Sequence, residues 1–144
     1  MKILVLNGPN MNLLGLREPE IYGRETYEDL VSLAEQTCRE AGLECICVQS
    51  NHEGVLIDEI QKARDGCGGI VINPAGYSHT SIALADALRA VDLPAVEVHI
   101  SDPEKREPYP HISPTRTPRR KVIKGKGLAG YREAILYLKE LAEK

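Results

Sequence analysis

The chain has 144 residues, of which 42% are hydrophobic and 27% are charged, and its formal net charge is −3. These are ordinary values for a soluble globular protein, and this length is expected to give one domain over residues 1–144. No apolar run approaches the roughly 20 residues of a membrane-spanning helix, and the first residues lack a signal-peptide pattern. The composition therefore argues against a membrane-spanning chain and predicts a cytoplasmic protein without a membrane partner.

Apolar residues recur with strand and helix spacing in alternation along the chain. Short apolar runs predict five strands, at residues 2–6, 44–49, 70–72, 95–100 and 122–123. Helical periodicity predicts four helices, at residues 26–41, at 55–64, from a start between 78 and 81 to 91, and at 128–143. Thr26, with Asp29 three residues later, approximates a capping box at the start of the first helix. The apolar residues expected on the third helix are Ile82, Leu84, Ala85 and Leu88.

This alternation predicts an α/β fold of the flavodoxin-like class, a three-layer sandwich with helices on both faces of a sheet. The sheet is expected to have five parallel strands in the order 2-1-3-4-5. Ligands of such folds bind in the crevice at the carboxyl ends of the strands. There the chain places Asn7 and Asn10, Asn73 and His99.

The four cysteines predict neither a zinc site nor a redox pair, because none are spaced as C-x-x-C. Cys45 and Cys47 are two residues apart, which on a strand places them on the same face. We expect buried, reduced thiols and no metal site.

A basic segment at residues 116–126 holds six of the 18 lysines and arginines and no acidic residue. Such a segment can attract phosphates or nucleic acid. It lacks interleaved aromatics and any recognisable nucleic-acid module, so a solvated or subunit-facing segment is the favoured reading and no nucleic-acid partner is expected.

The loop after the first strand carries Arg17 five residues before Tyr22. A guanidinium folded back beside the phenol would favour its ionised form, which could then act as a base. Taken alone, a loop tyrosine next to a glycine is more often a packing residue. Asn10 in the same loop is either a hydrogen-bond donor to a ligand or a turn former.

His99 ends the fourth strand, two residues after Glu97, so both side chains are expected on one face. The carboxylate could accept a hydrogen bond from one imidazole nitrogen and direct the other toward a ligand. A single histidine at a strand end would otherwise be structural.

Four segments together resemble the type II 3-dehydroquinate dehydratases. They are LNGPNMNLLGLREPEIYG at residues 6–23, QSNHEG at 49–54, NPAGYSHTSIALADAL at 73–88 and EVHIS at 97–101. The resemblance implies a hydro-lyase of the shikimate pathway that needs no cofactor. Its reaction would be a trans elimination of water from 3-dehydroquinate through an enolate, giving 3-dehydroshikimate.

The resemblance also assigns catalytic roles. It implies that Tyr22 abstracts the proton and that Arg17 activates it. Asn10 would stabilise the enolate. His99, oriented by Glu97, would protonate the leaving hydroxyl.

The substrate-binding residues implied by the resemblance are Asn73, His79, Asp86, Ile100 and Ser101. His79 is expected at the start of the third helix, with Asp86 two turns further on. Asp86 would reach the site of a neighbouring subunit in a dodecamer built from trimers. Asp86 alone would pass for a solvated helix charge.

The likeness weakens between residues 102 and 126. The family's basic run, whose arginine contacts substrate, is replaced here by Pro108-Tyr109-Pro110-His111-Ile112-Ser113. Arg106 or Arg116 could substitute for the missing arginine. This departure keeps open an alternative, a non-catalytic or altered-substrate paralogue that binds a small anion. A flavin-binding or phosphate-binding module is disfavoured, because Pro9 removes a backbone donor after the first strand.

Overall fold

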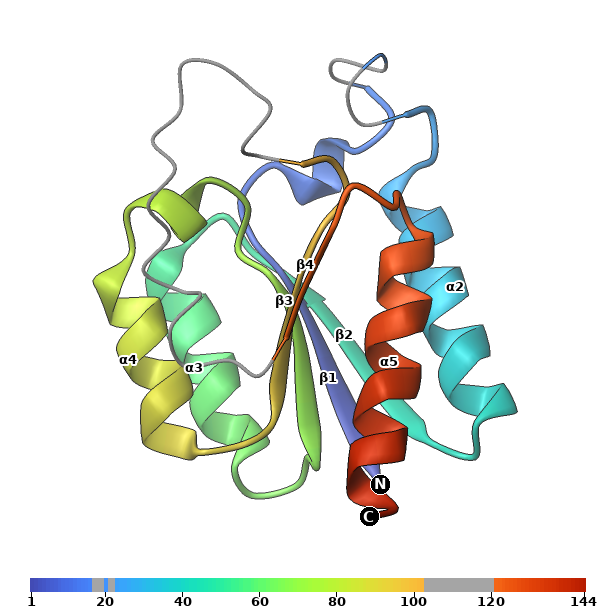
Figure 1. Cartoon of the computed structure of the whole chain (residues 1–144). Coiled ribbons are helices and arrows are strands. Elements are labelled where there is room, and N and C mark those ends of the chain that lie inside the picture. Colours follow the sequence, from blue (N-terminus) through green and yellow to red (C-terminus); the bar gives the residue numbers. More distant parts are fainter. Residues whose placement is uncertain (17–19, 21–22, 103–120) are drawn as a thin grey trace.

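A computed structural model describes residues 1–16, 20, 23–102 and 121–144, and these form one parallel sheet covered on both faces (Figure 1). The strands are β1 (Lys2–Asn7), β2 (Glu44–Gln49), β3 (Gly69–Asn73), β4 (Ala95–His99) and β5 (Lys121–Lys124). The helices are α2 (Tyr27–Glu40), α3 (Glu53–Ala63), α4 (Ile82–Val91) and α5 (Ala129–Ala142), with 3-10 helices η1 (Met11–Leu13) and η2 (Ala75–His79). The strand order is β2-β1-β3-β4-β5, which confirms the predicted fold class and sheet order.

Two apolar cores lie on the two sides of the sheet, because neighbouring residues of a strand point to opposite faces. In β1, Ile3 and Val5 pack under helices α2 and α5, whereas Leu4 and Leu6 pack under α3 and α4. Figure 1 shows these two helix pairs on opposite sides of the strands. Burial on both faces explains why the central strands are almost continuously apolar.

Two of the helices, α2 and α4, begin at side-chain caps, Thr26 and Ser81. Thr26 and Asp29 form the predicted capping box, in which the Asp29 N–H donates to Thr26 Oγ1 at 3.2 Å and the Thr26 N–H to Asp29 Oδ2 at 2.9 Å. The longest helices, α2 and α5, have 14 residues each. No helix within the described part of the chain is long and apolar enough to cross a bilayer.

The third helix begins at the end of the predicted range of starts, residues 78–81, and this excludes His79 from it. Ser81 accepts the Leu84 N–H at 2.9 Å as the cap of α4, so the helix begins at Ile82 and His79 belongs to the preceding 3-10 turn. His79 and Asp86 therefore do not share a helix, and the two-turn spacing between them was wrong. Ile82 is 73% exposed, so it faces away from the core.

The loops after β1 and β3 touch at Gly8. Its N–H donates to the Asn73 carbonyl at 2.8 Å, and a Cβ at this position would lie 2.5 Å from the Pro74 carbonyl oxygen. Side-chain atoms do not approach a carbonyl that closely, so only glycine allows this contact between the two central strand ends.

Gly8→Ala is therefore expected to lower the free energy of unfolding by about 1–3 kcal/mol, the usual cost of overpacking. Gly54→Ala is the matched control, because a Cβ there meets nothing within 4 Å. Urea denaturation of both variants measures the difference. Equal stability of Gly8→Ala and the parent protein would contradict the close approach.

Candidate active site

The ends of β1 and β3 carry two asparagines side by side. Asn7 and Asn73 pair directly in the parallel register, and both are buried. They lie at the carboxyl ends of neighbouring central strands, the edge at which ligands of such sheets bind. His99 ends the adjacent strand, β4, at the same edge.

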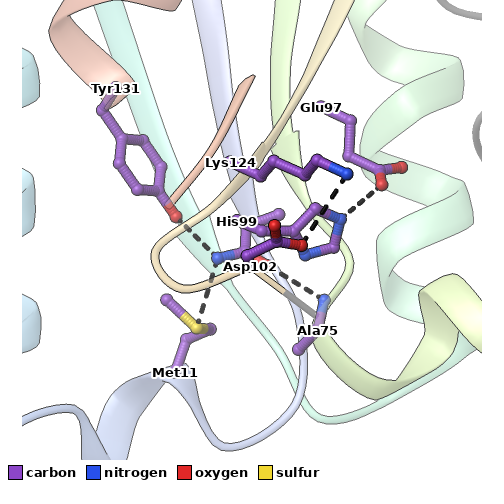
Figure 2. Close-up of polar contacts among 8 residues, drawn as sticks. Met11, Ala75, Glu97, His99, Asp102, Lys124 and Tyr131 are labelled. Carbon is purple, nitrogen blue, oxygen red and sulfur yellow. Dashed lines mark hydrogen bonds and ion pairs between the residues drawn. The ribbon is translucent and has the colours of Figure 1, made fainter. Parts of the chain in front are cut away.

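The buried hydroxyl of Tyr131, on α5, joins the two asparagines. It donates to Asn7 Oδ1 at 2.5 Å and accepts from Asn73 Nδ2 at 3.1 Å. The Asn73 amide makes two further contacts, with Oδ1 accepting the Ala75 N–H at 3.0 Å and Nδ2 lying 3.6 Å from Met11 Sδ (Figure 2). Asn73 is only 4% exposed, so its side chain is used to fix the loop after β3.

Burial keeps two phenols of this region protonated. It raises the pKa of Tyr131 well above the usual value of 10, although the hydrogen bond from Asn73 opposes the shift. Burial is also the main cause that raises the pKa of Tyr27 to about 12. Neither phenol is suited to act as a base at neutral pH, so both serve as hydrogen-bonding groups.

His99 and Glu97 form a buried pair on β4. His99 Nε2 contacts Glu97 Oε2 (Figure 2), and the two residues are 6% and 0% exposed. The His99 carbonyl accepts the Gly125 N–H at 3.2 Å, which ties the strand end to the turn after β5. Because β4 residues alternate, both side chains lie on the α3/α4 side of the sheet, opposite to Asn73. The carboxylate holds the imidazole at the carboxyl end of the strand.

Asn51 holds Asn10 in place. Asn10 has a left-handed backbone, with φ 70°, and its N–H donates to Asn51 Oδ1 at 2.9 Å. Gln49 Nε2 donates to the same oxygen and to the Gly8 carbonyl, each at 3.2 Å. The Tyr77 hydroxyl donates to the Asn51 carbonyl at 2.9 Å. These bonds connect the loops after β1, β2 and β3.

The other predicted site residues are placed as follows. His79 is half-buried in η2, and Asp86 is exposed on α4. Ile100 is 8% exposed, and its carbonyl accepts the Gly127 N–H at 3.0 Å. Ser101 is half-buried. Arg17, Tyr22, Arg106 and Arg116 lie outside the described residues.

The three lysines of the basic segment that the structure describes all contact other side chains. Lys121 Nζ lies 4.8 Å from the centre of the Tyr137 ring. Lys124 pairs with Asp102 at 3.7 Å, and Lys126 with Glu133 at 2.8 Å. These contacts agree with the structural reading of residues 121–126.

No three His, Cys, Asp or Glu side chains of the described chain are arranged to hold a metal ion. The groups present at the sheet edge are an imidazole with a carboxylate partner, amides and backbone donors, which suit proton transfer and hydrogen bonding to an oxygen-rich ligand.

Two structural residues of the site were missed in the sequence. In the sequence, Tyr131 is one more residue on the apolar face of the last helix, because hydrophobic periodicity does not show which groups its hydroxyl contacts. Asn51 lies inside the QSNHEG segment, one of the four that carry the family resemblance, but the sequence assigned no role to it.

The profile of the family described as dehydroquinase class II matches residues 1–139. The chain belongs to this family. As a class II dehydroquinase, it is 53% identical over 140 residues to the 3-dehydroquinate dehydratase of Corynebacterium glutamicum, with 97% of each chain covered. It is 48% identical to the catabolic 3-dehydroquinase 2 of Aspergillus flavus, covering 96% of this chain and 92% of that one. The crystal structure of type II dehydroquinase from Butyrivibrio crossotus superposes with a TM-score of 0.93 at 51% identity, covering 96% and 97% of the two chains.

Tyr131→Phe in this dehydroquinase leaves Asn7 Oδ1 and Asn73 Nδ2 without their buried partner. We expect a loss of about 1–3 kcal/mol in the free energy of unfolding, the cost of unsatisfied buried polar groups. Tyr137→Phe on the same helix is the control, because that half-buried ring meets Lys121 rather than an asparagine. If both variants unfold at the same urea concentration, the phenol does not support the strand ends.

Proposed function

We propose that this class II dehydroquinase removes water from 3-dehydroquinate to give 3-dehydroshikimate, as a hydro-lyase. The observation that carries the proposal is the 53% identity, over nearly the whole of both chains, to a 3-dehydroquinate dehydratase. The buried His99–Glu97 pair at the carboxyl edge of the sheet supports it, because an elimination needs a positioned acid for the departing hydroxyl.

Proton removal is assigned to Tyr22. The two buried phenols at the sheet edge have raised pKa values and are unsuited to this step. Tyr22 becomes a base if the Arg17 guanidinium lies close enough to stabilise its phenolate. Asn10 then stabilises the enolate oxygen that forms, from a backbone position fixed by Asn51.

Loss of the hydroxyl is assigned to His99. Glu97 holds Nε2, which leaves Nδ1 as the nitrogen that can give a proton to the leaving oxygen. Every step uses side chains of the protein, so the proposed reaction takes no cofactor or metal ion.

Substrate binding is assigned to groups around the same edge: Asn73, His79, Ile100, Ser101 and Arg106. Asn73 acts through the loop that its amide fixes, since that amide is occupied within the protein. The departure at residues 108–113 is the reason to retain an alternative, a paralogue that binds a small anion without turnover.

A neighbouring subunit is proposed to complete the site through Asp86. Asp86 is exposed on α4, and Ile82 lies one turn before it at 73% exposure. An exposed isoleucine beside a carboxylate suits a contact with another copy of the chain. We propose a homo-oligomer, a dodecamer built from trimers, that works in the cytoplasm.

The proposal is tested by mixing purified protein with 3-dehydroquinate and following the ultraviolet absorbance of the 3-dehydroshikimate formed. We expect turnover by the parent protein and a loss of at least about 100-fold in kcat for Tyr22→Phe, the scale of a missing general base. An inactive parent that still binds the substrate would favour the anion-binding paralogue. Full turnover by Tyr22→Phe would exclude Tyr22 as the base.

Asn51→Ala is expected to lower kcat, because Asn10 loses the acceptor that holds its left-handed backbone. Asn51→Asp keeps an oxygen at the same position and is expected to restore most of the activity. Gln61→Ala, on the exposed side of α3, is the control. Equal rates for the alanine and aspartate variants would show that the acceptor oxygen does not matter.

A further inference from the structure

A hydrogen bond between Glu53 and Ser81 joins the starts of helices α3 and α4. The Ser81 hydroxyl donates to Glu53 Oε2 at 2.5 Å. Glu53 is the first residue of α3, and Ser81 immediately precedes α4. The two helices lie side by side on one face of the sheet (Figure 1). Because α3 follows β2 and α4 follows the turn after β3, this bond lies at the carboxyl edge of the sheet.

The bond belongs to a strong class of hydrogen bonds. A hydroxyl that donates to a carboxylate does so at roughly 2.5–2.7 Å, and such a bond is about twice as strong as one between neutral groups. Ser81 is 2% exposed, so water has little access to its hydroxyl. Glu53 lies in the first turn of α3, where the helix dipole favours a negative charge. The carboxylate therefore directs the Ser81 proton toward itself.

The same hydroxyl is the cap of α4. Ser81 Oγ accepts the Leu84 N–H at 2.9 Å while its proton goes to Glu53. Hydrogen bonds in a chain polarise one another, so the bond to the carboxylate makes the Ser81 oxygen a better acceptor. A carboxylate of α3 thus strengthens the start of α4.

The chain offers a second cap three residues earlier, at Ser78. Serine is among the favoured residues at this position of a helix. A helix that began after Ser78 would include His79, whereas the observed α4 begins at Ile82 and leaves His79 in the turn η2. Glu53 bonds to Ser81, so it favours the later of the two starts.

The segment after β2 holds the turn that carries His79 at two points. The Tyr77 hydroxyl donates to the Asn51 carbonyl at 2.9 Å, and the Ser81 hydroxyl donates to Glu53. His79 lies two residues from each point of attachment. Together the two bonds fix the position of His79 relative to the loop between β2 and α3.

We propose that Glu53 is a positioning residue of the dehydration: it selects Ser81 over Ser78 as the cap of α4 and so keeps His79 outside the helix. This role rests on the proposed function, in which His79 binds substrate. Without the carboxylate, the molecules would divide between the two helix starts. Only those with the later start would hold His79 in its binding position, and the apparent affinity for substrate falls with their fraction.

Steady-state kinetics with 3-dehydroquinate test this role. We expect Glu53→Ala to raise KM at least about fivefold with kcat within about twofold, because saturating substrate draws all molecules to the competent start. Glu53→Gln keeps a neutral acceptor and is expected to give an intermediate KM. Asp58→Ala, which removes an exposed carboxylate from the same helix, is the matched control and should leave KM unchanged. An unchanged KM in both Glu53 variants would overturn the proposal.

Two serine variants test the choice of cap. Ser81→Ala removes the hydroxyl through which Glu53 acts, so adding it to Glu53→Ala should raise KM no further than the stronger single variant does. Ser78→Ala in the Glu53→Ala background removes the competing cap and should return KM toward the parent value. General destabilisation does not predict this rescue, because losing a second buried hydroxyl restores no packing. A KM that stays raised after Ser78→Ala would contradict the selection between caps.

A crystal structure of Glu53→Ala tests the helix start without turnover. Helical backbone at residues 79–81, as the sole or a second conformation, is expected. An α4 that begins at Ile82 alone would overturn the proposal. An inactive parent protein whose Glu53→Ala variant shows the earlier start would contradict the proposed function and retain the effect of Glu53 on the helix. An active parent whose KM is unchanged in both Glu53 variants would do the reverse.

Discussion

The hydrogen bonds of the Tyr131 hydroxyl are the constraint on which the carboxyl edge of the sheet depends. The two central strands end in buried asparagines on one face, and a buried amide without a partner costs about 1–3 kcal/mol. One phenol from α5 donates to the first asparagine and accepts from the second. Helix packing and strand-end position are thereby fixed together, and burial keeps the donating proton in place by raising the pKa of the phenol.

The proposed acid lies at the same edge, on the opposite face of the sheet from Tyr131 and the two asparagines. His99 and Glu97 face α3 and α4, so the proposed acid does not compete with Tyr131 for the same amides. Asn51 joins the two sides by binding Asn10 through its side chain and Tyr77 through its carbonyl. In the proposed elimination, the acid His99 would thus be held by Glu97 apart from the hydrogen bonds of Tyr131 that support the strand ends.

Local patterns in the sequence predicted most of the fold. Apolar spacing located all five strands, and the Thr26 capping box was predicted correctly, because both depend on residues close in the chain. The order of the strands was predicted from the flavodoxin-like fold class that the alternation of strands and helices indicated. The start of α4 was predicted only to the range 78–81, because both Ser78 and Ser81 are suitable caps, and His79 was therefore wrongly placed in the helix. The exposure of Ile82 depends on what packs beside it.

The roles of the site residues were predicted from the family resemblance. The role of Tyr131 was not predicted, because its partners Asn7 and Asn73 are distant in the chain and hydrophobic periodicity does not relate them to it.

Tyr131 and Asn7 are separated by 124 positions in the chain. Translation produces β1 first and α5 last, so the side-chain amides of Asn7 and Asn73 lack their shared hydrogen-bond partner until translation has nearly finished. Contacts between such distant segments also form slowly, because a long loop must close first. The carboxyl edge of the two central strands is thus completed late, and a nascent chain that stops short of residue 131 lacks the phenol that joins its two asparagines.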